Sequence, residues 1–220
     1  MCRVGLLCVK CDYYSQIWKG NTSREFLDKV GLHHLPEGSI GTGYSHQWRN
    51  FGGTIGNLDG VDQIVELLHS LRNDPTSRRH LVTAWNPTQL KGTPLPPCHI
   101  MHMYSVENNR LNNCFVMRSN DVYHGLPYNI AGYALLNMIF AQHLGLEPGK
   151  LVYMGWDAHL YNSQISAVEE QVQRDPRPLP VLKINKDITA FNDLLKLEWS
   201  DLELIGYDPH PAIDKVDMAI

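Results

Sequence analysis

The chain has 220 residues, a formal net charge of −4 at pH 7, and 43% hydrophobic and 19% charged residues. This length suits one domain with a sizeable core and is short for two. The negative charge excludes a global basic field that would draw the chain to nucleic acid or anionic membrane, so a phosphate group would need a local arginine cluster. The start, "MCRVGLLCVK", lacks the apolar region and cleavage site of a signal peptide, and no apolar run reaches membrane-spanning length, so we expect an intracellular, cytoplasmic protein.

The five cysteines are Cys2, Cys8, Cys11, Cys98 and Cys114. An odd number with uneven spacing does not indicate a disulfide framework. Cys8 and Cys11 form one CxxC pair, and without a second pair at zinc spacing this is a weak metal signal. We therefore expect no metal site, and a zinc protein built on Cys8 and Cys11 is the less favoured alternative.

Hydrophobic periodicity predicts the first elements in chain order. Residues 61–73 carry apolar side chains at helical spacing, and the pattern stops at "NDP", so a helix is expected there. Residues 80–87 are rich in β-forming side chains and end at a turn, which predicts a strand. Residues 99–121 predict two strands around the turn "ENN".

The second half of the chain contains the clearest element. Residues 129–145 are apolar nearly all round, which predicts a buried central helix that Gly145 closes. Late strands are expected in 177–184 and 201–207. Strands mixed with a few long helices indicate a single domain of the α+β class.

Cys98 lies in "PLPPCHIMH", where it could be a buried small hydrophobe, a metal ligand or a nucleophile. A nucleophilic thiol needs a nearby positive charge to raise its thiolate fraction. His99 is adjacent, but neighbouring residues on a strand point to opposite faces, so His99 is not automatically the base. The candidate cationic neighbours are Arg78 and Arg79 of "SRRH" and Arg118 of "MRSND".

A group of arginines and a serine allows both a functional and a structural interpretation. Arg78, Arg79, Arg118 and Ser119 could together bind a phosphate. From spacing alone, the favoured alternative is that Arg78 and Arg79 meet the end of the preceding helix and solvent.

The segment "GLPYNIAGY" places Asn129 at the start of the expected helix, where it is either an N-cap or a reader of a planar, amide-like edge. In "DAHLY", His159 and Tyr161 share a face if the segment is extended. They could bind a sugar hydroxyl or simply form a half-buried strand edge.

Taken together and in chain order, these motifs resemble the thymidylate synthase family. The resemblance runs from about residue 15 to residue 220, through "GYSHQWRNFGG", "LPPCH", "RSNDVYHGLPYNIAGYALL", "DAHLY", "IGYDPHPAI" and "MAI", whereas residues 1–14 match no family segment. It implies a thymidylate synthase-like α+β fold in which a mixed sheet forms a homodimer interface. It also implies one-carbon transfer from 5,10-methylenetetrahydrofolate to C5 of dUMP, giving dTMP and dihydrofolate.

The resemblance assigns catalytic and nucleotide-binding roles residue by residue. Cys98 would add to C6 of the pyrimidine, and Asn129 would read the uracil edge. The implied catalytic residues are Cys98, Arg118, Asn129, Tyr44 and His99. The implied substrate-binding residues are Arg78, Arg79, Arg118, Ser119, Asn129, His159 and Tyr161. Among these, Arg78 and Arg79 would reach across a two-fold interface into the neighbour's phosphate site.

The implied folate contacts are Trp18, Asp121, Gly125 and Ala219, the last in a tail that would close over the bound folate. Phage dCMP hydroxymethylases carry a similar "MRSND", so a dUMP hydroxymethylase giving 5-hydroxymethyl-dUMP is the second candidate. The family places an arginine loop and a catalytic glutamate before the segment that matches "SQIW", and residues 1–14 match neither. A relative that only binds nucleotide is therefore the third candidate. No specific nucleic acid partner is expected, because no stripe of lysine and arginine is present.

Overall fold

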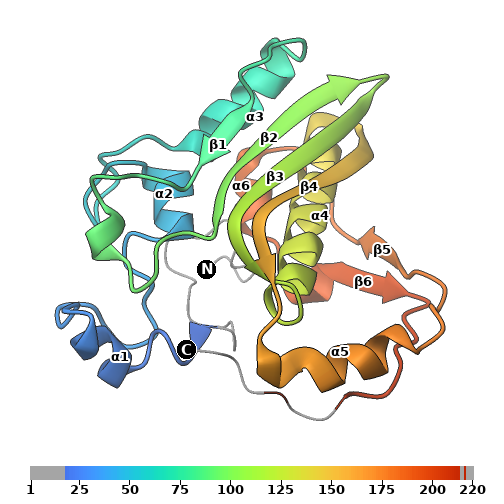
Figure 1. Ribbon diagram of the computed structural model, residues 1–220. Helices are drawn as coiled ribbons and strands as arrows, with labels where there is room; N and C mark the ends of the chain where they lie inside the picture. The colour runs from blue at the N-terminus through green and yellow to red at the C-terminus, as the bar shows by residue number, and fades with distance from the viewer. Residues whose placement is uncertain (1–17, 214–215, 217–220) are drawn as a thin grey trace.

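The computed structural model describes residues 18–213 and residue 216 (Figure 1). Its α-helices are α1 (Arg24–Lys29), α2 (Tyr44–Asn50), α3 (Gln63–Asn73), α4 (Gly125–Leu144), α5 (Ile165–Val172) and α6 (Phe191–Leu195). Its strands are β1 (Leu81–Thr83), β2 (His99–Glu107), β3 (Arg110–Asp121), β4 (Glu147–His159), β5 (Val181–Ile184) and β6 (Leu202–Ile205). Short 3₁₀ turns are η4 (Leu90–Gly92), η5 (Asn162–Gln164) and η6 (Trp199–Asp201). In this described part, no helix combines the length and apolar character needed to cross a membrane.

The main sheet is mixed, as expected, with the strand order β1-β2-β3-β4. β1 pairs antiparallel with β2, β2 antiparallel with β3, and β3 parallel with β4. The predicted β2–β3 hairpin turns at Asn108 and Asn109, whose φ angles of 50° and 59° lie in the left-handed region that asparagine adopts more readily than most residues. The two late strands, β5 and β6, form a separate antiparallel pair.

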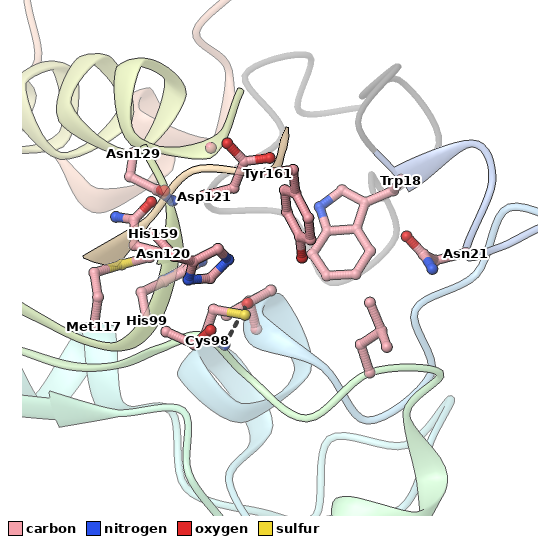
Figure 2. A pocket seen from close by; sticks show the side chains of 14 residues that line it. Trp18, Asn21, Cys98, His99, Met117, Asn120, Asp121, Asn129, His159 and Tyr161 are labelled. Atoms are coloured by element: carbon pink, nitrogen blue, oxygen red, sulfur yellow. Dashed lines mark hydrogen bonds between the residues drawn. The ribbon is translucent and has the colours of Figure 1, made fainter. Parts of the chain in front are cut away.

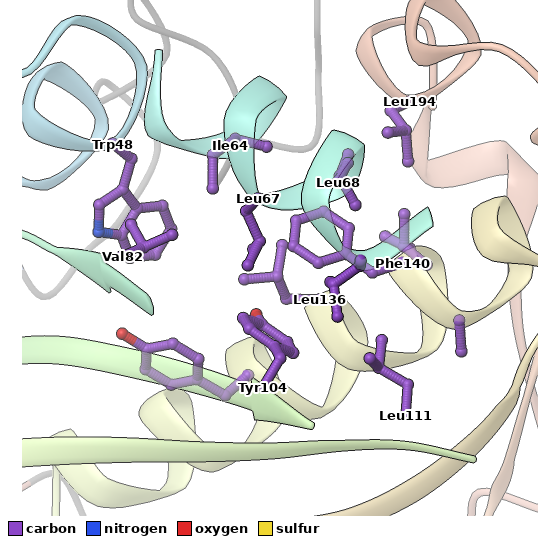
Figure 3. Close-up of a cluster of buried hydrophobic side chains, with 14 of the residues drawn as sticks. Trp48, Ile64, Leu67, Leu68, Val82, Tyr104, Leu111, Leu136, Phe140 and Leu194 are labelled. Carbon is purple, nitrogen blue, oxygen red and sulfur yellow. The ribbon is translucent and has the colours of Figure 1, made fainter. Parts of the chain in front are cut away.

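The core lies between helices α3 and α4 and the inner face of the main sheet. Leu67 and Leu68 of α3 meet Leu136 and Phe140 of α4 (Figure 3). Phe115 of β3 belongs to the same cluster and is fully buried. Helix α4 runs along one face of β3 and β4 (Figure 1). The predicted buried central helix is therefore confirmed, as is its end at Gly145, which has a φ of 69°.

The start of α4 differs from the prediction. The helix begins at Gly125, so Asn129 lies in its second turn and is not the N-cap. The carboxylate of Asp121 accepts the backbone N–H groups of Tyr123 and His124 and so satisfies donors before the first turn. Pro127 is tolerated because the first-turn N–H groups have no helical partner to lose. The sequence pattern missed this turn because it contains a glycine and a proline, which usually mark the boundary of a helix.

The two faces of β4 differ in exposure. Leu151 and Tyr153 pack against the core, whereas Val152, Met154 and Trp156 are exposed by 45%, 53% and 90%. Side chains alternate between faces along a strand, so these three apolar side chains lie on the face opposite α4. In the described part of the chain, the sheet thus presents an exposed apolar strip.

Candidate active site

An open pocket forms where the start of β2 and the ends of β3 and β4 meet the start of α4 (Figure 2). It encloses about 820 Å³ of atom-free space, counting its open mouth. The pocket is lined by Trp18, Asn21, Tyr44, Leu95, Cys98, His99, Met117, Ser119, Asn120, Asp121, Gly125, Asn129, His159 and Tyr161. Ten of these are residues that the sequence analysis named as site residues.

Cys98 lies immediately before β2 and faces Arg118 of the neighbouring strand. The Arg118 backbone N–H donates to the Cys98 carbonyl at 2.8 Å, and Arg118 Nη2 lies 3.9 Å from Cys98 Sγ. The guanidinium also donates to the carbonyl oxygens of Pro96 (2.8 Å) and Pro97 (2.9 Å). Arg118 therefore secures the proline segment and also places a positive charge beside the sulfur.

The Cys98 thiol has a pKa above its ordinary value. Burial raises this pKa because it disfavours the thiolate, while the charge of Arg118 and a hydrogen bond from the Tyr44 side chain lower it by less. The hydroxyl of Tyr44 also accepts the backbone N–H of Cys98 at 2.8 Å. In the ligand-free protein, the thiol is therefore the main form at neutral pH, with two groups in place to stabilise the thiolate.

His99 contacts the aromatic core. Its ring stacks on Tyr44 with 3.7 Å between ring centroids, and its Nδ1 pairs with the Tyr133 hydroxyl at 2.7 Å. Burial lowers the pKa of His99 to about 3, so the imidazole is neutral at physiological pH. The Nδ1 of His99 thus pairs with Tyr133 and not with the sulfur of Cys98. This agrees with the expectation that neighbouring residues on a strand point to opposite faces.

Asp121 is held by three hydrogen bonds. Its Oδ1 accepts the N–H groups of Tyr123 (3.0 Å) and His124 (2.8 Å), and its Oδ2 accepts Gln164 Nε2 at 2.8 Å. Gln164 is fully buried, and its Oε1 accepts the backbone N–H of Tyr161 at 2.9 Å. This arrangement ties the end of β3 to the segment after β4.

His159 and Tyr161 come together as the extended interpretation of "DAHLY" predicts. Their ring centroids lie 5.2 Å apart at an interplanar angle of 90°, and both side chains line the pocket. Asn129 enters the same pocket from α4, and Figure 2 shows its side chain beside Asn120.

Three of the site residues predicted from the sequence do not line this pocket, and a fourth lies outside the described residues. Arg118 contacts Cys98 through its guanidinium and is not among the lining residues. Arg78 and Arg79 are exposed and lie between α3 and β1. Ala219 lies outside the described residues, as do Cys2, Cys8 and Cys11. Among the described residues, no group of three or more His, Cys, Asp or Glu side chains is arranged to hold a metal ion.

Asn21, Leu95, Met117 and Asn120 line the pocket without having been assigned a role from the sequence. Asn120 is only 2% exposed. The sequence offered one signal for Asn120: in "MRSND" it lies between Ser119 and Asp121, which were both predicted to be site residues.

Comparisons with known proteins identify the family. The family model described as thymidylate synthase matches residues 11–220. The chain is 44% identical over 207 residues to a bifunctional dihydrofolate reductase-thymidylate synthase of Zea mays, covering 90% of this chain and 39% of that protein. It is 40% identical over 209 residues to one of Paramecium tetraurelia, covering 92% and 44%. The thymidylate synthase of Saccharomyces cerevisiae is 38% identical over 213 residues, covering 90% of this chain and 69% of the yeast protein.

The chain spans about two fifths of the length of the bifunctional relatives it matches. The match nevertheless runs through every segment that contributes to the pocket and includes Cys98, Arg118 and Asn129. From this match and the pocket it covers, the chain belongs to the thymidylate synthase family.

Proposed function

We propose that the chain transfers a one-carbon unit from 5,10-methylenetetrahydrofolate to C5 of dUMP, giving dTMP and dihydrofolate. The observation that carries this proposal is Cys98, whose sulfur lies 3.9 Å from Arg118 Nη2 in a pocket that Asn129 also enters. Family membership and the named activity of the yeast relative support it.

In this proposal Cys98 is the nucleophile. Its sulfur adds to C6 of the pyrimidine, and C5 then carries the electron density that attacks the one-carbon unit. Loss of the C5 proton and, later, of the bond between sulfur and C6 restores the pyrimidine double bond and frees Cys98. Because burial raises the pKa of Cys98, the protein must stabilise the thiolate when it reacts, and Arg118 and the Tyr44 hydroxyl are placed to do so. His99 supports Tyr44 by stacking on its ring.

The remaining nucleotide contacts follow from the pocket lining. The amide of Asn129 offers a donor and an acceptor side by side, which matches N3–H and a carbonyl of uracil. His159 and Tyr161 are the proposed ribose contacts. Arg118 and Ser119 are proposed to bind the phosphate together with Arg78 and Arg79 of a second subunit.

The residues present also fit a folate. The indole of Trp18 offers an aromatic surface, and the carboxylate of Asp121 offers acceptors for N–H groups of a pterin ring. A Cβ at Gly125 would lie 3.3 Å from Asn120 Oδ1, so glycine keeps this part of the pocket open. When bound, the folate supplies the one-carbon unit and the hydride. Ala219 is a proposed contact of the terminal segment.

We further propose a homodimer formed through the main sheet. Val152, Met154 and Trp156 give the sheet an exposed apolar strip of the kind that marks protein interfaces. A two-fold pairing of this face would bury the strip against its own copy.

The cytoplasm is the proposed location because it keeps cysteine thiols reduced, as the reaction needs. The division of the chain at residue 15 stays a prediction.

A dUMP hydroxymethylase is the second candidate. Met117, which "MRSND" shares with hydroxymethylase relatives, lines the pocket together with Cys98. Water in place of hydride would then give 5-hydroxymethyl-dUMP.

Mass spectrometry of the nucleotide formed from dUMP and 5,10-methylenetetrahydrofolate separates the candidates, with Cys98→Ala as the control. The proposed function predicts dTMP and dihydrofolate from the wild-type protein and no product from the variant. A hydroxymethylated nucleotide would support the second candidate. Bound dUMP without any product would contradict both and leave a nucleotide-binding relative.

A further inference from the structure

Asn120 is a buried amide whose hydrogen-bonding groups are unused. It is 2% exposed, and neither its Nδ2 nor its Oδ1 has a hydrogen-bond partner among the described residues. Burying an amide without a partner costs stability, because its hydrogen bonds to water are lost and not replaced. A partner for this side chain is therefore expected to come from a molecule that enters the pocket.

The side chain lies at the wall of the pocket that Asn129 shares. Asn120 lies near the end of β3, opposite the first turns of α4. A Cβ built on Gly125 would be 3.3 Å from Asn120 Oδ1 and 3.7 Å from Asn129 Oδ1. The two amide groups are therefore neighbours around one glycine, and Figure 2 shows them next to each other.

Two neighbouring amides suit the edge of a pyrimidine. One amide can pair with N3–H and one carbonyl, because its donor and acceptor lie side by side. A carbonyl oxygen has two lone pairs, so O4 of uracil can accept a second hydrogen bond from another amide. Cytosine carries an amino group at C4, which needs an acceptor instead.

We propose that Asn120 is a second base-reading residue, which hydrogen-bonds the exocyclic group at C4 of the pyrimidine beside Asn129. This inference rests on the proposed function, since it takes dUMP as the ligand. Beside Asn129, Asn120 would donate through Nδ2 to O4 of uracil, so losing this donor should weaken dUMP binding more than dCMP binding.

The test measures the Kd of dUMP and of dCMP by calorimetry for the full chain and its variants. Asn120→Ala should weaken dUMP binding by at least about tenfold and dCMP binding by less, because only O4 loses a donor. Asn120→Asp should lower the ratio of dCMP Kd to dUMP Kd further, because a carboxylate accepts from the 4-amino group and repels O4.

Asn113 offers a matched control on the same strand. It is 1% exposed, its Nδ2 donates to the Met103 carbonyl at 3.2 Å, and it does not line the pocket. Asn113→Ala should lower the Tm and leave the ratio of the two Kd values unchanged.

The outcomes separate this inference from the proposed function. The base-reading role of Asn120 is overturned if wild type binds dUMP and both Asn120 variants keep the wild-type ratio of dCMP Kd to dUMP Kd. It is also overturned if both variants lose the two ligands equally. In either case the proposed function stands. If folded wild type binds neither nucleotide, both are overturned. Asn120→Ala removes an unpaired buried amide, so this variant should fold at least as well as wild type. If Asn120→Asp fails to fold, Asn120→Ala alone still decides the test.

Discussion

Gln164 Nε2 donates to Asp121 Oδ2 at 2.8 Å. Asp121 lines the pocket, and Gln164 is fully buried next to it. The other end of the same amide accepts the backbone N–H of Tyr161 at 2.9 Å. One side chain thus connects a proposed folate contact with a proposed ribose contact. A short hydrogen-bonded link of this kind fixes both groups at once, so Gln164 is a positioning residue for the two ligands.

Replacing Gln164 should therefore affect both ligands. Gln164→Met keeps the approximate volume, removes both hydrogen bonds and leaves Asp121 with one fewer donor. Losing them should cost about 1–3 kcal/mol, seen as a rise of about 5- to 150-fold in the KM for 5,10-methylenetetrahydrofolate and a smaller rise for dUMP. Steady-state kinetics with each ligand varied in turn checks this split.

Gln142→Met is the matched control, because Gln142 Nε2 on α4 donates to the Lys186 carbonyl at 2.9 Å, away from the pocket. It should lower the Tm without changing either KM. Equal changes in KM for the two variants would contradict a positioning role for Gln164.

Tyr44→Phe should make Cys98 less reactive. The change removes the hydroxyl that lowers the pKa of Cys98 and keeps the ring that stacks on His99. Because burial already raises this pKa, alkylation of Cys98 should accelerate as pH rises, and the variant should need a higher pH for the same rate. Iodoacetamide labelling, followed on the Cys98 peptide by mass spectrometry between pH 6 and pH 10, measures both midpoints. An unchanged midpoint would show that Tyr44 does not stabilise the thiolate.

Two buried histidines should make the fold sensitive to acid. Burial lowers the pKa of His99 and of His102 to about 3, against an ordinary value of 6.5. The unfolded chain then binds more protons than the folded one between these values, so stability is complete above about pH 6.5 and is lost as pH falls toward 3. Each histidine should lower the free energy of unfolding by about 1.4 kcal/mol per pH unit in this window.

Urea unfolding at pH 7, 6, 5 and 4 measures this slope. His102→Asn should reduce the slope, because it removes one of the two groups that take up a proton on unfolding. The same slope in the variant and in wild type would show that His102 is not responsible for the acid sensitivity.

Trp156→Asp should weaken the proposed dimer. The indole is 90% exposed on the apolar strip of β4, and a charge there would have to be buried against the second copy. Light scattering after size exclusion should show a dimer for wild type and a monomer for the variant at micromolar concentration. Leu179→Asp is the control, since Leu179 is 91% exposed but lies outside the main sheet. Monomeric wild-type protein would contradict the prediction.

Mixing two inactive variants tests the shared phosphate site. Cys98→Ala lacks the nucleophile, and the double variant Arg78→Ala, Arg79→Ala lacks the proposed contacts across the interface. If each site combines Cys98 of one subunit with the arginines of the other, mixed dimers contain one complete site, and dTMP formation should return after refolding the two together. Activity that stays absent in the mixture would argue for sites built within a single subunit.

Local sequence patterns were sufficient for the elements whose residues interact with near neighbours. The apolar spacing of α3, the closure of α4 at Gly145 and the Asn108–Asn109 turn are short-range features, and the structure confirms all three. The chain order of the motifs around Cys98, Arg118 and Asn129 likewise identified the family without coordinates. These features could be read directly because each depends on residues that are close in the chain or on an unusual motif.

Features that depend on distant segments needed the folded chain. The start of α4 at Gly125 depends on Asp121, whose carboxylate is in turn held by Gln164, 43 residues away. The unused amide of Asn120 is visible only once α4 packs against β3, because burial and the lack of a partner are properties of the packed structure. Motifs along the chain therefore determined the chemistry this protein carries, and tertiary packing decided which side chains meet in the pocket, since hydrogen bonding and desolvation depend on distance in space.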